Sequence, residues 1–352
     1  MFNHFLHVKM VIAKKISKYF HQKFGGIKLK LYKKLLCISI ALLLFVAPFK
    51  NAQAVTEEAW SEAVTVYGAA LEQNSTLQSK TKALLGTEDS DKVTYVHAND
   101  LTNYLKLQSN DSVLKSSIRI KKLASGDGLT LNINQTAGKI TKITEDTYKN
   151  ALLTAGVTDA EVTIASAEDV TGESALAGVY KAFESQGETI DTSRTQAAQD
   201  ELSSISTIDQ ENAGKEGYSQ EQLNKAIAEA KAEIAKQGAN LNTTEIKNIV
   251  EQKIDNNGLN NVLNDNQINI IVNFINNAQN SGVFSGENKD KFINGAKDYV
   301  NEIKNSDGFK QAADKAKDMG KNIKDSLEKE GVWDKFMNFI QSIIDAITSL
   351  FK

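Results

Sequence analysis

The sequence of 352 residues contains one cysteine and one proline, Cys37 and Pro48, and both lie near its N-terminus. Histidine is almost as scarce, because His97 is the only one of four histidines beyond residue 54. Without cysteine no disulfide can form, so stability must come from packing. Zinc, haem and iron–sulfur centres need thiolate or imidazole ligands that the chain beyond residue 54 does not supply. We therefore expect no cofactor and no metal site.

The N-terminal region has the composition of a secretory signal peptide. Residues 1–54 include ten lysines and no acidic residue, and an apolar run at residues 35–47 precedes the small-residue pattern Ala52-Gln53-Ala54. This order of basic, apolar and small-residue segments is typical of a cleaved leader. The apolar run is shorter than the roughly 20 residues that a membrane span requires. We expect cleavage between Ala54 and Val55 and a secreted or cell-surface protein, with either Met1 or Met10 as the start.

Removal of the leader would make the protein strongly acidic. The whole chain has a formal charge of −3, from 41 basic and 44 acidic residues. Taking away ten lysines leaves 31 basic residues and a charge of −13. Nucleic-acid binding needs clustered lysine and arginine, so this balance excludes nucleic acid as a partner.

The remaining chain divides by its hydrophobic pattern into a mixed region and a helical region. Residues 55–209 alternate between strand and helix periodicity, and Gly126-Asp127-Gly128 between two β-rich runs predicts a hairpin. Residues 210–330 show successive amphipathic helices with capping residues such as Ser219 and Asn242. We expect an α+β fold, an α/β-like N-terminal domain followed by an all-α helical tail with a C-terminal amphipathic helix at residues 331–352.

Part of this pattern resembles a known family, the YpuA-like extracellular proteins of Gram-positive bacteria, which are classed as a domain of unknown function. The shared residues are Tyr148, Asn150 to Leu152, Thr154 to Gly156, Asp159, Ala160, Gly172 to Ala175, and Lys181 to Glu184. The family usually has a proline within residues 165–174, where this chain has Glu168 or a neighbour. The resemblance implies export and an α/β domain with a helical tail, and it implies no reaction.

Ser174 is the first candidate nucleophile, because it follows Gly172 at an expected strand-to-helix turn. A nucleophile elbow reads G-x-S-x-G, but the last position here is Leu176, and the only histidine of this region, His97, precedes the serine. A helix cap explains Ser174 more simply, since serine hydroxyls accept bonds from first-turn N–H groups. We interpret Ser174 as a cap, with Thr171 as the alternative.

Other candidate sites are weaker still. Ser112 and Lys115 match the first element of serine–lysine acyl enzymes, but no Lys-Thr-Gly follows. Glu88, Asp89 and Asp91 lack the spacing of a calcium loop and are expected to form an exposed acidic turn. A pair of carboxylates could still hydrolyse a glycan, although the two tryptophans, Trp60 and Trp333, lie at the chain ends and leave few aromatic platforms for sugar stacking. We therefore expect no catalytic residue, with an envelope hydrolase as the alternative function.

The C-terminal segment has the broadest apolar stripe of the chain. Its members at helical spacing include Trp333, Phe336, Ile340, Ile343, Ile344 and Ile347. Burial of such a stripe is worth on the order of 10 kcal/mol at roughly 25 cal/mol per Å², so it must meet another surface. That surface is either the helical tail itself or a partner, namely the cell envelope, a membrane surface or another protein. The sequence thus predicts a non-catalytic, envelope-associated binding protein.

Overall fold

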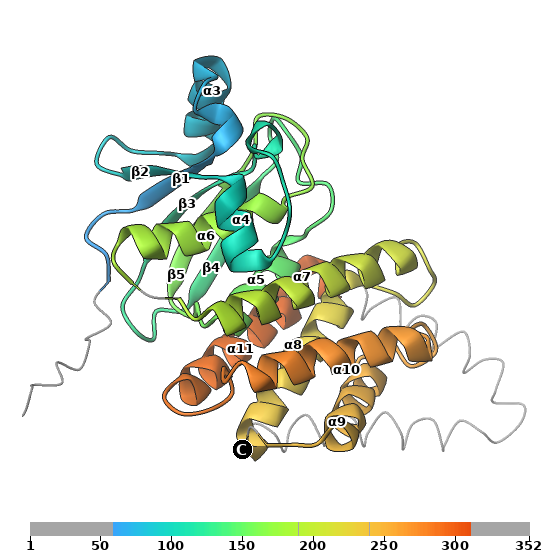
Figure 1. Cartoon of the computed structure of the whole chain (residues 1–352). Coiled ribbons are helices and arrows are strands. Elements are labelled where there is room, and N and C mark those ends of the chain that lie inside the picture. The colour runs from blue at the N-terminus through green and yellow to red at the C-terminus, as the bar shows by residue number, and fades with distance from the viewer. Residues whose placement is uncertain (1–58, 189, 239, 311–352) are drawn as a thin grey trace, which may run out of the picture. The chain divides into compact units, whose positions relative to one another are not determined.

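The computed structural model describes residues 59–188, 190–238 and 240–310, which all belong to one compact unit, Glu57–Lys352. Its strands are β1 (Val64–Gly68), β2 (Lys92–Val96), β3 (Ser117–Lys122), β4 (Leu129–Asn134) and β5 (Ala160–Ala165). Its first helices are α3 (Ser75–Leu85), α4 (Ala98–Leu105), α5 (Glu145–Ala155) and α6 (Glu173–Ser185). The later helices are α7 (Thr192–Asn212), α8 (Gln220–Gln237), α9 (Thr243–Asn256), α10 (Asp265–Asn280) and α11 (Asn288–Asn305). The expected α+β class with a helical C-terminal part is confirmed (Figure 1).

The five strands form one mixed sheet in the order β2-β1-β3-β5-β4. Strand β3 runs antiparallel to β1 and β5, whereas the outer pairs β1–β2 and β5–β4 are parallel. The predicted hairpin around residues 126–128 is therefore wrong, because β5 lies between β3 and β4. Asp159, just before β5, explains the difference: its Oδ1 accepts the N–H groups of Gly126 and Gly128 at 2.7 and 3.0 Å. The Gly-Asp-Gly segment thus folds around the start of the inserted strand.

Strand alternation gives the sheet two different faces. Val66, Ile118 and Ile164 point into the main core, which also contains residues of α4, α5 and α6. Helix α6 contacts β1, β2 and β3 (Figure 1), and Gly178 lets it approach closely. A Cβ at Gly178 would lie 3.2 Å from Ile118 Cγ1, so the Ile118 side chain would have to move by a few tenths of an ångström to admit a larger residue. Successive side chains of a strand point to opposite faces of the sheet, and Tyr67 of β1 belongs instead to a smaller cluster that includes residues of α3.

Helices α7 to α11 enclose a second hydrophobic core. It is built from the apolar stripes that the sequence predicts on α8 to α11, and Leu153 of α5 and Ile205 of α7 also belong to it. Ser219, Asn242 and Asn264 each accept first-turn N–H bonds at the starts of α8, α9 and α10, as their capping patterns indicate. Ser219 and Asn242 are the capping residues that the sequence predicts, and Asn264 caps α10 in the same way.

A buried ion pair joins the two cores. Lys231 of α8 bonds Glu201 of α7, and both side chains have 0% exposure. The lysine Nζ also donates to Asn150 O at 3.1 Å and to Thr154 Oγ1 at 3.0 Å, both on α5. Burial raises the pKa of Glu201 and lowers that of Lys231, while attraction within the pair opposes both shifts. Three helices are therefore held at one point by charges that have no contact with water.

Several predictions from the sequence fall outside the described residues. These are the leader at residues 1–54 and the apolar face from Trp333 to Ile347. Within the part that the structure covers, no helix combines the length and apolar character needed to traverse a bilayer. The proposed domain boundary at Asp209 stays a prediction, and α7 runs through it as one helix of 21 residues.

The buried pair gives a direct stability prediction. Lys231→Met leaves the Glu201 carboxylate buried without its cation, so we expect a loss of about 3–5 kcal/mol in unfolding free energy. Urea unfolding followed by circular dichroism measures this loss. Lys247→Met is the matched control, because Lys247 pairs with Glu251 at 3.7 Å on the surface and should cost at most about 1 kcal/mol. Equal losses in the two variants would contradict the anchoring role of Lys231.

Candidate functional site

A cavity of about 530 Å³ lies beside the start of α6, and we call it the α6 cavity. The segment 107–116, the segment 169–172 and helices α6 and α7 contribute to its wall. Its volume lies within the range of about 300–1,000 Å³ that is usual for small-molecule sites. The polar lining residues are Gln108, Ser109, Ser112, Lys115, Ser116, Lys142, Asp169, Thr171, Glu173, Ser174, Gln199 and Ser203.

Ser174 lies in this wall, but it is not the cap of α6. The N-cap residue is Gly172, and Ser174 is the second residue of the helix. The Ser174 hydroxyl is paired with the hydroxyl of Ser116, and it donates to the Ser116 carbonyl oxygen at 3.4 Å. The cap prediction is therefore wrong: Ser174 joins the helix to the beginning of β3. Its partner is another serine, not a base, so this contact does not activate Ser174 as a nucleophile.

Gly172 gives the turn into α6 a conformation that other residues rarely adopt. Its φ is +111°, and its carbonyl accepts a 2.6 Å hydrogen bond from the buried Tyr148 hydroxyl of α5. A Cβ at this position would lie 2.5 Å from that hydroxyl oxygen. Glycine is thus required at position 172 both by the positive φ and by the approach of the Tyr148 hydroxyl. The hydrogen bond from Tyr148 fixes the position of Gly172 in the cavity wall.

Two ion pairs lie at the edge of the cavity. Lys115 contacts Glu168 at 2.5 Å, and Lys142 contacts Glu173 at 3.0 Å. Burial raises the pKa of Glu173, but hydrogen bonds from Thr171, from the backbone and from Lys142 outweigh it, so the net pKa is lowered. Ser112 and Lys115 both line the cavity, yet the amine of Lys115 is directed to Glu168. Both signs of charge therefore border the site.

Gln199 of α7 is the one lining residue with an unpaired buried atom. Its side chain is buried, and its Nε2 donates to Ser203 Oγ at 2.7 Å. Its Oε1 has no hydrogen-bond partner. A buried polar atom without a partner costs about 1–3 kcal/mol, and native structures contain only a few of them.

A second cavity, of about 390 Å³, collects carboxylates near the start of α5, and we call it the α5 cavity. Glu145, Asp146, Glu221 and Glu302 line it together with Lys149. Burial raises the pKa of Asp146 to about 6, and Glu221 and Glu302 add to the shift in the same direction. Glu145 is committed to structure, because its Oε1 accepts the N–H of Ile133 at 2.7 Å.

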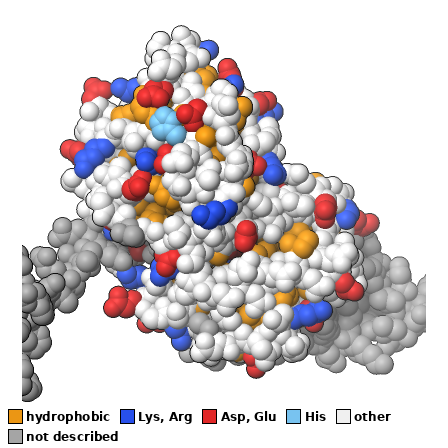
Figure 2. All heavy atoms as spheres, in the orientation of Figure 1, with side chains coloured by type: hydrophobic (Ala, Val, Ile, Leu, Met, Phe, Trp, Pro, Cys, Tyr) orange, Lys and Arg blue, Asp and Glu red, His pale blue; other side chains and the backbone are white. Residues whose placement is uncertain are grey.

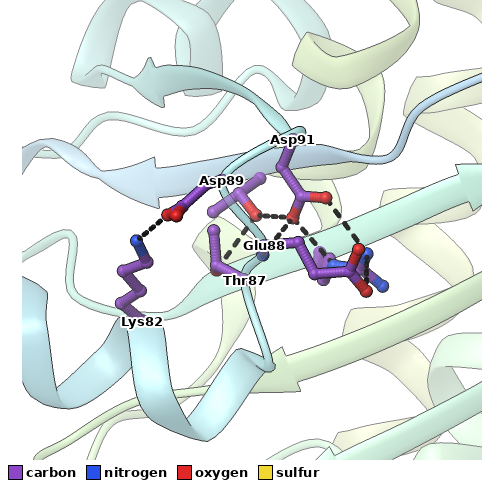
Figure 3. A network of polar contacts seen from close by, with 7 residues as sticks. Lys82, Thr87, Glu88, Asp89 and Asp91 are labelled. Atoms are coloured by element: carbon purple, nitrogen blue, oxygen red, sulfur yellow. Dashed lines mark hydrogen bonds and ion pairs between the residues drawn. The ribbon is translucent and has the colours of Figure 1, made fainter.

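The predicted acidic turn is a structured ion network (Figure 3). Arg119 of β3 contacts Asp91 at 2.8 Å and Glu88 at 3.2 Å, while Asp89 pairs with Lys82. The expectation of an exposed turn is wrong for Asp91, whose side chain is 1% exposed. Burial raises the pKa of Asp91, but bonds from Arg119 and Thr65 outweigh it and the net pKa is lowered. The network therefore ties the loop after α3 to the sheet.

The other sequence candidates give no further site. His97 precedes α4, its N–H donates to Asp100 Oδ2 at 2.9 Å, and its ring Nδ1 lies 3.1 Å from Asp111. In the described ranges no group of three His, Cys, Asp or Glu side chains could hold a metal ion. Acidic and basic side chains are interspersed on the face shown in Figure 2, and its hydrophobic groups are small and separate.

Sequence reasoning named Ser174 and Ser112 but did not predict that they share a cavity, nor did it find Gln199 or Asp146. A weak pattern was present for Asp146, which follows the cap residue Thr144 and so lies in the first turn of α5. No pattern distinguished Gln199, because it is one polar residue in a polar helix.

Comparison with known proteins assigns the chain to a family. The profile described as "Protein of unknown function (DUF1002)" matches residues 67–295. An "Uncharacterized protein YpuA" of Bacillus subtilis (strain 168) is 32% identical over 242 residues, which cover 68% of this chain and 71% of that protein. The resemblance to YpuA-like proteins is confirmed. No solved structure matches the chain.

The raised pKa of Asp146 predicts an unusual pH dependence. The folded pKa of about 6 exceeds the ordinary value of 3.8, so the native state binds more protons between these values and its stability falls as pH rises from about 4 to 6. Asp146→Asn removes this slope and should stabilise the protein by about 1–3 kcal/mol at pH 7. Urea unfolding at several pH values measures both effects, with the exposed Glu216→Gln as control. An unchanged slope in Asp146→Asn would show that this carboxyl titrates normally.

Proposed function

We propose that this chain, which belongs to the DUF1002 family of proteins of unknown function, is an exported, envelope-associated protein that binds a ligand in the α6 cavity without transforming it. The observation that carries the binding proposal is the cavity itself. It combines a ligand-sized volume of about 530 Å³ with a buried, unpaired amide oxygen on Gln199. The composition of residues 1–54 and the C-terminal apolar face support export and envelope association.

The chemistry of the cavity wall favours binding over catalysis. Acyl transfer by a serine needs a base within hydrogen-bond reach. The hydroxyls of Ser116 and Ser174 are bonded to each other, and the amines of Lys115 and Lys142 are bonded to carboxylates. These two hydroxyls and two amines are thus held by partners that do not activate them.

The alternative function is an envelope hydrolase that uses paired carboxylates, and the α5 cavity supports it. A glycosidase needs one carboxyl that stays protonated near neutral pH and a second that is ionised. Asp146, with a pKa of about 6, has the first property, and Glu221 and Glu302 line the same cavity. Glu302 is paired with Lys149. This arrangement carries less weight because no Phe, Trp or Tyr is among the described residues that line the α5 cavity, so a sugar ring has no aromatic side chain to stack on there.

Export and envelope association predict a defined N-terminus and a fractionation pattern. Expressed in a Gram-positive host, the protein should leave the cytosol and begin at Val55, because the apolar run and Ala52-Gln53-Ala54 direct cleavage there. Fractionation with N-terminal mass spectrometry tests this. The full chain should sediment with envelopes, whereas a chain lacking residues 331–352 should remain in the medium. Intact precursor in the cytosol contradicts export, and equal sedimentation of both chains contradicts the role of the C-terminal face.

The distinction between binding and hydrolysis has its own experiment. A fluorophosphonate probe should leave Ser174 unlabelled, and the purified protein should release no fragments from peptidoglycan or glycan substrates. If fragments appear and Asp146→Asn abolishes them while Glu216→Gln does not, the hydrolase is the correct function. Labelling of Ser174 would instead establish a serine nucleophile and refute the non-catalytic proposal.

A further inference from the structure

The chemical class of the ligand can be argued from the wall of the α6 cavity. We infer that this ligand is a short peptide with free amino and carboxyl termini. The inference rests on the proposed binding function and adds a substrate class to it. Three properties of the wall carry it: the balance of its charges, the unpaired amide of Gln199, and the mixture of hydroxyl and aliphatic groups without aromatic rings.

The charges of the wall match a zwitterion. The lining contains two basic residues, Lys115 and Lys142, and two acidic residues, Asp169 and Glu173. The lysine side chains are 33% and 35% exposed, and ion pairs this accessible to water contribute little stability of their own. A ligand carboxylate can therefore replace Glu173 beside Lys142 at small cost, which frees Glu173 for a ligand ammonium group.

Gln199 requires a hydrogen-bond donor from the ligand. In the observed orientation its Nε2 is bonded to Ser203 and its Oε1 is unpaired. The wall therefore contains an amide oxygen that lacks a donor. The N–H of a peptide group is a donor of this kind, and its carbonyl oxygen can accept a bond from a neighbouring hydroxyl of the wall.

The remaining lining residues suit peptide side chains and backbone. Ser109, Ser112, Thr171 and Ser203 supply hydroxyls that donate or accept, and Leu101, Leu107, Leu114 and Val170 supply aliphatic surface. No Phe, Trp or Tyr is among the described residues that line the cavity. Sugars and nucleobases are normally held by stacking on such rings, so their absence favours a peptide with small side chains.

Binding of model peptides to the purified full chain tests this inference. Isothermal titration calorimetry compares Ala-Ala and Ala-Ala-Ala with N-acetyl-Ala-Ala-amide and with cellobiose, and NMR shifts of the lining residues locate each ligand. We expect the free peptides to shift these residues, and the capped peptide to bind at least about tenfold more weakly because it lacks both terminal charges. Lys142→Met and Lys115→Met should each weaken binding of Ala-Ala-Ala about tenfold.

Lys82→Met is the matched control, because Lys82 of α3 also forms an exposed ion pair, with Asp89, but does not line the cavity. This variant should bind Ala-Ala-Ala normally. If cellobiose or the capped peptide binds the cavity as tightly as the free peptides, the ligand class is wrong while the proposed function stands. If none of the four compounds shifts the lining residues, both the ligand class and the binding function are refuted. Normal binding by both Lys115→Met and Lys142→Met also overturns the charge argument.

Discussion

The buried contact between Lys231 and Glu201 is the constraint on which the arrangement of this protein depends. Two full charges are removed from water, and only their mutual attraction and the added bonds to Asn150 and Thr154 compensate for that loss. These bonds form only when α5, α7 and α8 lie in one relative position. The sheet-covering helix α5 is thereby fixed to the helical region, and Asn150 extends the contact by donating to Asn224 of α8 at 2.9 Å.

The same constraint accounts for the placement of both cavities. Helix α7 carries Glu201 to the buried pair and, half a turn earlier, Gln199 to the α6 cavity. Helix α5 carries Asn150 and Thr154 to the pair and Asp146, one turn earlier, to the α5 cavity. Each cavity is therefore lined by a helix whose rotation about its axis is already determined. Sites built on such rigid elements hold their polar groups in defined positions without needing flexible loops to order them.

The sequence predicted local structure well where local interactions decide it. The starts of α8 and α9 follow from the capping residues Ser219 and Asn242, and the structure places both helices accordingly. The hairpin at residues 126–128 was wrong because its turn composition is also compatible with a loop that binds Asp159, a residue about 30 positions away. Asp91 was misjudged for the same reason: its partner Arg119 is distant in sequence, and composition alone shows only a run of acids.

The site was less predictable than the fold. Ser174 was interpreted as a helix cap because serine is a common capping residue and lies near the start of α6. Its actual partner is the Ser116 hydroxyl, which meets Ser174 only because α6 packs on β3. The shifted pKa of Asp146 depends on burial by α8 and α11, which no local pattern describes. The charge-balanced lining of the α6 cavity likewise combines residues from segments separated by more than 80 positions, between Lys115 and Gln199.

The insertion of β5 between β3 and β4 has a consequence for how the chain acquires its structure. When residues 117–134 have been synthesised, β3 can pair only with β1, and β4 has no strand beside it. The segment that pairs with both β3 and β4 follows only at Ala160–Ala165. This part of the sheet therefore cannot close from local contacts, and its completion depends on a later part of the polypeptide.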